Sequence, residues 1–414
     1  MSLPLLRTRS VAPILMPLLC WLIPAIHAQS SNFGIIPSPS PNLHGNTLNA
    51  LAAVSTNSLW AVGFQNDNQL NGSRTLTEHW DGRQWTVVPS PNPGSPPSCD
   101  GQNSGNMLNA AAAAGPGDVW AVGFQFSCRT LLQPLILHWN GSAWVKVQSP
   151  PLLTNDNSAL NGIQAFSSSN IYAVGYQPAP NGAVRSLVEH WDGTAWSVMP
   201  SANGNATGSP LNAVSGTAPT DIWAVGDLVA PNRAVLTLTE HFDGTQWTVV
   251  PSPSPVRGSD LDQNVLTAVY AAASNDVTAV GFTLNLATQT ELTLIEHWDG
   301  ARWSAVPSRN QSTAIGSLNT LTGVSGSSGS DLYAVGYYED AATGGQPQTL
   351  IEHFDGSVWT IVPSPAEGLA QHLNGVLAVP GATNVWTVGA FAINGDDPET
   401  GLLQVPQALV LLKP

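Results

Sequence analysis

The residues of this chain that could do chemistry recur at one repeated position. Six of the nine histidines occupy it, and five of the six directly follow a glutamate. A carboxylate beside an imidazole suits acid–base catalysis or metal ligation. Adjacent side chains of a β-strand point to opposite faces, however, so such a pair cannot converge on one substrate. We therefore expect buried polar groups that form hydrogen bonds between neighbouring repeats. The histidines are His79, His138, His190, His241, His297 and His353, and the glutamates are Glu78, Glu189, Glu240, Glu296 and Glu352, with Leu137 in the remaining copy.

Tryptophan is the second candidate group, because exposed indole rings can serve as platforms for sugars. Fourteen of the fifteen tryptophans lie at repeated positions, and the other, Trp21, precedes the repeats. We expect the repeated ones to pack between adjacent sheets. They are Trp60, Trp120, Trp223 and Trp386, then Trp80, Trp139, Trp191 and Trp298, and finally Trp85, Trp144, Trp196, Trp247, Trp303 and Trp359.

Carboxylates outside the repeated positions are the remaining catalytic candidates. The sequence has no nucleophile elbow, phosphate-binding loop, zinc-protease motif or EF-hand loop. The stretches SDLDQN and NGDDPE could bind calcium weakly, but they lack the ligand spacing of a calcium loop, so we expect no cofactor and no metal. Most of these carboxylates are expected to be solvated. They are Asp67, Asp156, Asp227, Asp260, Asp262, Glu291, Glu339, Asp340, Asp396, Asp397 and Glu399.

The elements that position these residues come from an internal repeat. Its copies begin with Leu-Asn or Leu-Thr at Leu48, Leu108, Leu160, Leu211, Leu266, Leu321 and Leu373. Each copy contains a second segment such as SLWAVGF, a third such as TLTEHW, a tight Asp-Gly or Asn-Gly, and a fourth segment that starts at a tryptophan. Four short strands in each of seven copies, without a helical period, predict an all-β fold, a seven-bladed β-propeller with four antiparallel strands per blade.

The last copy lacks its fourth strand, because the chain ends at Pro414 soon after PQALVLLKP. A matching ending, NFGIIPSPSPN, stands before the first copy, at residues 32–42. We expect residues 33–42 to form the outer strand of the seventh blade, so that both ends of the chain share one sheet. This closure removes the unpaired edges of the first and last blades.

The repeats resemble those of secreted bacterial propeller proteins with Trp-Ala-Val-Gly and Trp-x-Val-Val-Pro-Ser-Pro-Asn motifs, and they are distantly similar to kelch-type blades. The resemblance covers residues 33–414. The chain has one glycine where kelch blades have two, and its Asp-Gly-x-x-Trp turn is one residue shorter than the sialidase-type Asp-box. The resemblance implies the fold, and most such proteins have no assigned activity.

The first 28 residues have the composition of a secretory signal peptide. Arg7 and Arg9 precede an apolar run, and Ala28 offers a small residue for cleavage. The run is short and contains proline, so we expect no membrane span. A lipoprotein modified at Cys20 is the alternative, but the residues before that cysteine are bulky. We therefore expect residues 29–414 to be a single secreted propeller domain, extracellular or periplasmic.

Charge and cysteine content agree with export. Lys and Arg number 12 and Asp and Glu 27, which gives −15; without Arg7 and Arg9 the balance is 10 minus 27, or −17. Nucleic acid is not expected as a partner, because a phosphate backbone requires a basic surface. Cys99 and Cys128 are expected to form a disulfide, with two buried thiols as the alternative.

Any ligand site should lie on one face of the ring. The first-to-second and third-to-fourth turns emerge on one face, here the short-turn face, and the second-to-third loops and links between repeats emerge on the other, the long-loop face. Cys99 and Cys128 both fall on the long-loop face. Binding sites concentrate on variable loops held by a rigid scaffold. We expect the site near Asp67, Asp260, Asp262, Glu339, Asp340, Asp396 and Asp397.

These features favour a secreted, monomeric binding protein without enzymatic activity that recognises a protein or a glycan through the long-loop face. The alternative is a polysaccharide hydrolase or lyase that uses loop carboxylates such as Asp340, Asp396 or Asp397. Two carboxyls in a shared cleft would favour that alternative. A purely structural component of the cell envelope, without a concave pocket, is a third possibility.

Overall fold

The structure is a computed structural model that describes residues 33–67, 72–95, 104–128, 130–152, 157–202, 207–259, 261–394 and 404–414. Every regular element in these residues is a β-strand, as the sequence predicts. Asn32–Pro414 form one compact unit. Within the described residues, no helix is long and apolar enough to span a membrane. The predicted signal peptide, residues 1–28, lies outside them.

Consecutive strands are grouped in fours, and each strand pairs antiparallel with the next one of its group. Single parallel pairings, Ser73 with Gly105 and Val235 with Gln263, join neighbouring groups at two places. The groups are called units and named by their strands. They are β2 (Asn46–Ser55), β3 (Ser58–Asp67), β4 (Gly72–Trp80) and β5 (Trp85–Val87); β6 (Gly105–Gly115), β7 (Asp118–Ser127), β8 (Thr130–Trp139) and β9 (Trp144–Val147); β10 (Ala159–Ser167), β11 (Asn170–Pro178), β12 (Val184–Trp191) and β13 (Trp196–Met199); β14 (Leu211–Ala218), β15 (Asp221–Val229), β16 (Val235–Phe242) and β17 (Trp247–Val249); β18 (Gln263–Ala273), β19 (Asp276–Asn285), β20 (Thr290–Trp298) and β21 (Trp303–Val306); β22 (Leu318–Ser328), β23 (Asp331–Glu339), β24 (Gln348–Phe354) and β25 (Trp359–Ile361); and β26 (Leu369–Ala378), β27 (Val385–Asn394) and β28 (Gln404–Lys413) with β1 (Gly34–Ile35).

The third and fourth strands are joined by the predicted tight turns. Asp81 Oδ1 accepts the backbone N–H groups of Arg83 and Gln84 at 2.8 and 2.9 Å, and Gly82 has a φ of 92°. This left-handed conformation favours glycine. Equivalent glycines have φ between 88° and 95° at Gly141, Gly193, Gly244, Gly300 and Gly356.

The glycine of the second strand is required by a close approach of the backbone. A Cβ on Gly63 would lie 2.0 Å from Thr47 O of the neighbouring strand β2, far inside van der Waals contact. The same collision, at 1.9 to 2.1 Å, would occur at Gly123, Gly175, Gly226, Gly281, Gly336 and Gly389. The recurring Val-Gly is therefore a packing requirement of the first two strands.

The Leu-Asn or Leu-Thr pair that opens each repeat forms a β-bulge in the first strand. In β2 the register against β3 shifts between Leu48 and Ala50, which leaves Asn49 outside the ladder. Asn49 Nδ2 donates to Leu108 O of the next unit at 2.8 Å. Equivalent bonds of 2.7 to 3.0 Å run from Asn109 to Leu160, Asn161 to Leu211, Asn212 to Leu266, Thr267 to Leu321, Thr322 to Leu373 and Asn374 to Leu48.

The N-terminal strand belongs to the last unit. Gly34 pairs with Leu412 and Ile35 with Leu411, antiparallel along β28, and Ile36 N–H donates to Val410 O at 2.9 Å. The displaced ending of the sequence thus supplies the outer strand of the last unit, but only Gly34–Ile35 of the predicted residues 33–42 form a strand.

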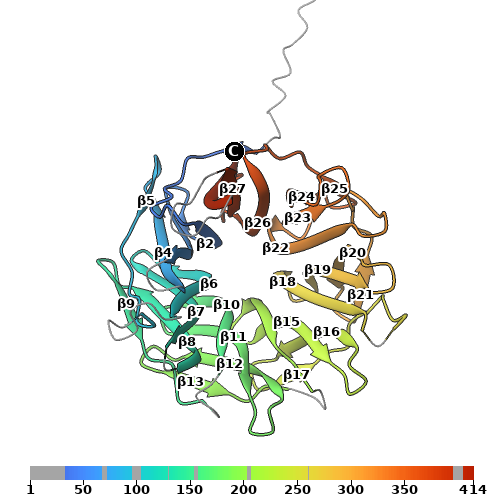
Figure 1. Cartoon of the computed structure of the whole chain (residues 1–414). Coiled ribbons are helices and arrows are strands. Elements are labelled where there is room, and N and C mark those ends of the chain that lie inside the picture. The colour runs from blue at the N-terminus through green and yellow to red at the C-terminus, as the bar shows by residue number, and fades with distance from the viewer. Residues whose placement is uncertain are drawn as a thin grey trace, which may run out of the picture. The chain divides into compact units, whose positions relative to one another are not determined.

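The units are arranged radially, with first strands such as β2, β6, β18 and β22 near the centre and fourth strands such as β5, β9 and β21 at the periphery (Figure 1). The first strands line a central cavity of about 530 Å³ with mostly small and aliphatic side chains, among them Ala52, Ala112 and Val269. Residues from the first strand of every unit take part in this lining.

Aromatic side chains fill the space between neighbouring units. Trp60 of β3 lies 4.7 Å from Trp139 and 5.1 Å from Trp144 of the next unit, measured between ring centroids. Trp386 of β27 contacts Trp80 and Trp85 in the same way, at 5.0 and 5.6 Å. The expected role of these tryptophans in packing is confirmed.

Candidate functional site

The repeated histidines form hydrogen bonds within their own unit. His138 Nε2 lies 2.8 Å from Asp118 Oδ1 at the start of β7, and its ring stacks on Trp120 with centroids 4.2 Å apart. Equivalent partners at 2.8 to 3.0 Å are Ser58 for His79, Asn170 for His190, Asp221 for His241, Asp276 for His297 and Asp331 for His353. The predicted bonds between repeats are therefore wrong for the histidines. The strand register places His138 opposite Trp120. Asp118 lies two residues before Trp120 in β7, on the same face of the sheet, so the imidazole of His138 reaches it.

Four of the five repeated glutamates bind the link that precedes their unit, as predicted, and Glu296 has no hydrogen-bond partner among the described residues. All five are 0% exposed. The partners of the four are serines or a backbone N–H of the link that precedes their unit, so the Pro-Ser-Pro motif has a structural role. Ser38 donates to Glu78 at 2.6 Å, Ser149 to Glu189 at 2.8 Å, Ser201 to Glu240 at 2.7 Å and Arg309 N–H to Glu352 at 3.0 Å.

Burial changes the protonation of these carboxyls. It raises the pKa of Glu78, Glu189 and Glu352 to about 7 and that of Glu296 to about 8, and it also raises the pKa of Glu240. A raised pKa in a cleft can indicate a catalytic acid. These carboxyls have no access to a substrate, however, because they are fully enclosed between units.

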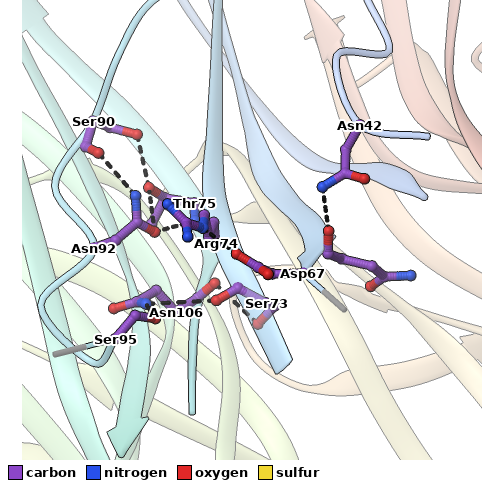
Figure 2. A network of polar contacts seen from close by, with 10 residues as sticks. Asn42, Asp67, Ser73, Arg74, Thr75, Ser90, Asn92, Ser95 and Asn106 are labelled. Carbon is purple, nitrogen blue, oxygen red and sulfur yellow. Dashed lines mark hydrogen bonds and ion pairs between the residues drawn. The ribbon is translucent and has the colours of Figure 1, made fainter. Parts of the chain in front are cut away.

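The links on the long-loop face are held by buried amides. Asn92 of the Pro-Ser-Pro-Asn link accepts the Thr75 N–H at 2.7 Å, and Ser90 Oγ lies 2.8 Å from Thr75 Oγ1. Asn106 Oδ1, which is 0% exposed, accepts the Gly94 N–H at 2.7 Å. Figure 2 shows Asn92 with Thr75 and Ser90, and Asn106 with Ser73 and Ser95. The long-loop face is therefore a rigid base for its loops.

Two predicted site residues of this face are bound internally. Asp67, which is nearly buried, forms an ion pair with Arg74 across β3 and β4 (Figure 2). Asp340 Oδ1 accepts the N–H groups of Ala342 and Thr343 at 2.8 and 2.9 Å, so its carboxylate closes the loop between β23 and β24.

Asp262 holds the SDLDQN stretch together through backbone N–H groups. Its Oδ2 accepts the N–H groups of Gly258 and Ser259 at 2.7 and 2.8 Å, and its Oδ1 accepts that of Leu286 at 3.0 Å. These bonds lower the pKa of Asp262, that from Leu286 most. The described residues contain no group of three or more His, Cys, Asp or Glu side chains placed to hold a metal ion.

Several predicted residues lie outside the described residues. They are Cys99, Asp156, Asp260, Asp396, Asp397 and Glu399. Cys128 directly follows β7 on the long-loop face, and its predicted disulfide with Cys99 stays a prediction. The same holds for any site formed by Asp396 and Asp397.

One pair of carboxylates does approach across a boundary between units. Glu291 at the start of β20 and Glu339 at the end of β23 interact electrostatically. The charges of both glutamates also raise the pKa of Tyr337. Burial raises the pKa of Glu291, and the charge of Glu339 raises it further. Thr320 donates a hydrogen bond to Glu291. The sequence placed both glutamates among loop carboxylates but gave no signal that they would meet.

The most exposed large apolar side chains of the described residues all lie on the long-loop face. Leu43, Leu261 and Ile315 lie in links between units and Leu131 at the start of β8; they are 83%, 55%, 82% and 52% exposed, respectively. The exposed valines of the fourth strands reach only 38% to 41%.

Cavities occur on both faces of the described part. On the long-loop side, one of about 240 Å³ is lined by Asn232, Arg257 and Asp262, and one of about 330 Å³ by Gln125, Lys146 and Pro150. Burial lowers the pKa of Lys146. A third, of about 480 Å³, opens between the β18–β21 and β22–β25 units on the short-turn side.

Comparison with known proteins supports the fold. No protein-family model and no curated protein matches the sequence. A solved structure described as YCF48 bound to a D1 peptide has a TM-score of 0.51 at 12% identity, covering 92% of this chain and 95% of that chain. Two structures of a polysaccharide lyase of family PL25, an ulvan lyase, have TM-scores of 0.51 at 7% and 8% identity, each covering 91% of this chain and 94% of that chain. These likenesses identify an all-β, propeller-like fold built from repeated four-stranded antiparallel sheets.

Proposed function

We propose that this chain is an exported, closed seven-bladed β-propeller that binds a protein partner through its long-loop face and catalyses no reaction. The bonds from the bulged Asn and Thr residues support the closed ring, because they lead from each unit to the next and from Asn374 back to Leu48. The pairing of β1 with β28 supports it as well. The resemblance to secreted propeller repeats supports export and a monomeric domain.

The exposed apolar side chains of the long-loop face carry the proposal for a protein partner. Leu43, Leu131, Leu261 and Ile315 are the most exposed large apolar residues described, and all four project from links and loops on one face. Apolar side chains that contact a partner lose water on binding, whereas the polar groups of this face, such as Asp262 and Asp340, are already engaged with backbone. A glycan, which offers mainly hydroxyl groups, fits this surface less well.

A binding screen of the mature chain tests this proposal. We expect displayed peptides rich in apolar residues to be selected, and the double variant L261D/I315D to lose at least tenfold in affinity for them. The control V145D/V198D places the same two charges on exposed valines of fourth strands, and it should bind like the wild type. Selection of glycans on an array, or equal binding by L261D/I315D, contradicts the proposal.

The disulfide can be measured on the mature protein. We propose that Cys99 and Cys128 are bonded in the secreted protein, which would pin the long link before β6 to the loop after β7. The intact mass of the mature chain should then match the loss of two hydrogens and should increase after reduction. Two alkylatable thiols in the unreduced protein would disprove the bond.

Polysaccharide cleavage is the second candidate, and the Glu291–Tyr337–Glu339 cluster favours it. Glu291 is half-buried, and burial together with the nearby Glu339 raises its pKa, so its carboxyl could act as a general acid. The test is activity on neutral and acidic polysaccharides. Cleavage that is lost in E291Q and E339Q but kept in D340N would replace binding as the function, and no cleavage of any substrate would remove this candidate.

A further inference from the structure

One unit lacks the aromatic side chain that the other units place against their neighbour. Three residues before the second-strand glycine, every other unit has an aromatic ring, whereas the β18–β21 unit has Thr278. The aromatic residues are Trp60, Trp120, Tyr172, Trp223, Tyr333 and Trp386. The sequence shows the same departure as DVTAVGF among segments such as DVWAVGF.

At Trp120 the ring has three neighbours that fix its position, whereas the indole N–H of Trp223 has no hydrogen-bond partner among the described residues. Trp120 stacks on His138 with an interplanar angle of 17° and donates its indole N–H to Asp118 Oδ1 at 2.8 Å. The edge-on neighbour is a tryptophan of the next unit, as in the pair of Trp223 and Trp303, at 5.1 Å and 87°. An imidazole, a carboxylate and an indole thus define the position of the ring.

These neighbours remain where the ring is missing. His297 Nε2 is 3.0 Å from Asp276 Oδ1, and Trp359 of the next unit packs against Phe354 at 5.3 Å. Between them lies the cavity of about 480 Å³, which is lined by Thr278, Asp276, His297, Phe354 and Trp359. Its volume is within the range of small-ligand sites.

The neighbouring strand does not replace the missing ring. Tyr270 is the cross-strand partner of Thr278, at a position where the other units have Ala, Gln, Ser or Leu. Tyr270 lines the central cavity instead and does not line the cavity at Thr278. A Cβ on Gly329, at the edge of this cavity, would lie 1.7 Å from Asp276 Oδ2, so a larger residue there would displace that carboxylate.

We propose that this cavity, the Thr278 pocket, binds a planar aromatic ring with a hydrogen-bond donor, above all an indole, either free or as a side chain of a peptide. The bound ring takes the place that Trp120 takes in its unit: it stacks on His297, meets Trp359 edge-on and donates its N–H to Asp276. Asp276 and Asp299 line the pocket, so neutral or cationic ligands are preferred over anionic ones.

The site is independent of the proposed partner-binding face. The turn residues Asn275, Asp299, Gly329 and Gly356 surround it, and these belong to the short-turn face. Substitutions at Thr278 should therefore leave binding at the long-loop face unchanged, so the two proposals can fail separately.

Fluorine NMR with 5-fluoroindole tests the pocket. We expect the mature protein to bind this probe with a dissociation constant of about 1 mM or below, as befits a small fragment. T278W should abolish binding, because the protein then supplies its own ring, and T278Y serves the same purpose should T278W fail to fold. T278V keeps the shape of the side chain and should bind within about threefold of the wild type.

Two further probes identify the source and the charge preference. A peptide with one central tryptophan and blocked ends should compete with 5-fluoroindole if the natural ligand is a side chain, and failure to compete restricts the ligand to a free ring. Tryptamine should compete at least tenfold better than indole-3-acetate. Equal binding by the wild type, T278W and T278Y, or no binding of 5-fluoroindole by the wild type, would overturn the proposal.

Discussion

At the scale of single residues, burial decides the chemistry of the repeated Glu-His pair. The glutamate faces the preceding link and is fully enclosed, whereas the histidine faces the aromatic ring of its own unit. In the β18–β21 unit, Ser252 of the preceding link donates to Thr237 at 2.8 Å, and neither carboxylate oxygen of Glu296 has a hydrogen-bond partner among the described residues. Burial raises the pKa of Glu296 to about 8, and Ser252 opposes this shift.

The raised pKa of Glu296 predicts a stability that falls as pH rises. In the unfolded chain a glutamate titrates near its ordinary pKa, so between about pH 4.3 and the folded value of about 8 the folded state binds the additional proton. Stability from this group is fully present below pH 4 and is lost as pH rises through 8. One pKa unit corresponds to about 1.4 kcal/mol, so the effect amounts to a few kcal/mol. Thermal unfolding of wild type and E296Q from pH 5 to 9 should show a smaller decrease in E296Q; parallel curves would contradict the pKa assignment.

The second-strand glycine gives a second residue-scale prediction. G123A would place a Cβ 2.0 Å from Met107 O and should lower the free energy of unfolding by about 3 kcal/mol. Gly115 of the same unit is the matched control, because a Cβ there meets nothing within 4 Å. Urea denaturation of both variants measures the difference, and equal stabilities would show that β6 and β7 separate easily.

At the scale of the elements, the β-bulge of the first strand turns a repeat signature into a contact between units. The extra residue leaves the ladder, and its side chain satisfies a backbone carbonyl of the neighbouring bulge. Asn and Thr both serve, since Asn374 donates at 2.9 Å and Thr322 at 2.7 Å. The contact requires a short side chain that can donate a hydrogen bond to the backbone carbonyl of the neighbouring unit.

This equivalence makes a test of the contact between the last and first units possible. N374A should leave Leu48 O without its partner and lower the free energy of unfolding by about 1 to 3 kcal/mol. N374T should recover most of that loss, because threonine fills this role in two units. Equilibrium unfolding in urea is the measurement; equal effects of both substitutions would mean that the hydrogen bond contributes nothing.

The sequence predicts the elements well where local chemistry determines them. The turn glycines, the strand order and the tryptophan packing follow from residue types and from the repeat. The partner of each histidine could not be predicted, because it depends on cross-strand register, and the role of the Leu-Asn pair depends on a bulge that shifts this register. The interaction of Glu291 with Glu339 depends on how two units are placed relative to each other. The repeat pattern of the sequence does not contain this information.

At the scale of the whole molecule, the shared sheet of the two chain ends predicts that the order of the chain can be changed. A circular permutant in which residues 33–42 follow Pro414 through a short glycine-serine linker should fold, because the moved strand can still pair with β28. Its thermal midpoint should lie within a few degrees of the wild type, and simple deletion of residues 33–42 should lower it clearly. A permutant as unstable as the deletion would show that this strand acts through its N-terminal position.

The pairing of β1 with β28 also sets the order of events during synthesis. Gly34 is among the first residues of the described chain to be made, and its partner Leu412 is among the last. The leading strand therefore remains without its β-sheet hydrogen bonds until β28 has been made. Contacts between residues so distant in sequence form slowly. Resistance to proteases and to aggregation should consequently arise late and abruptly, once the final strand is free to pair.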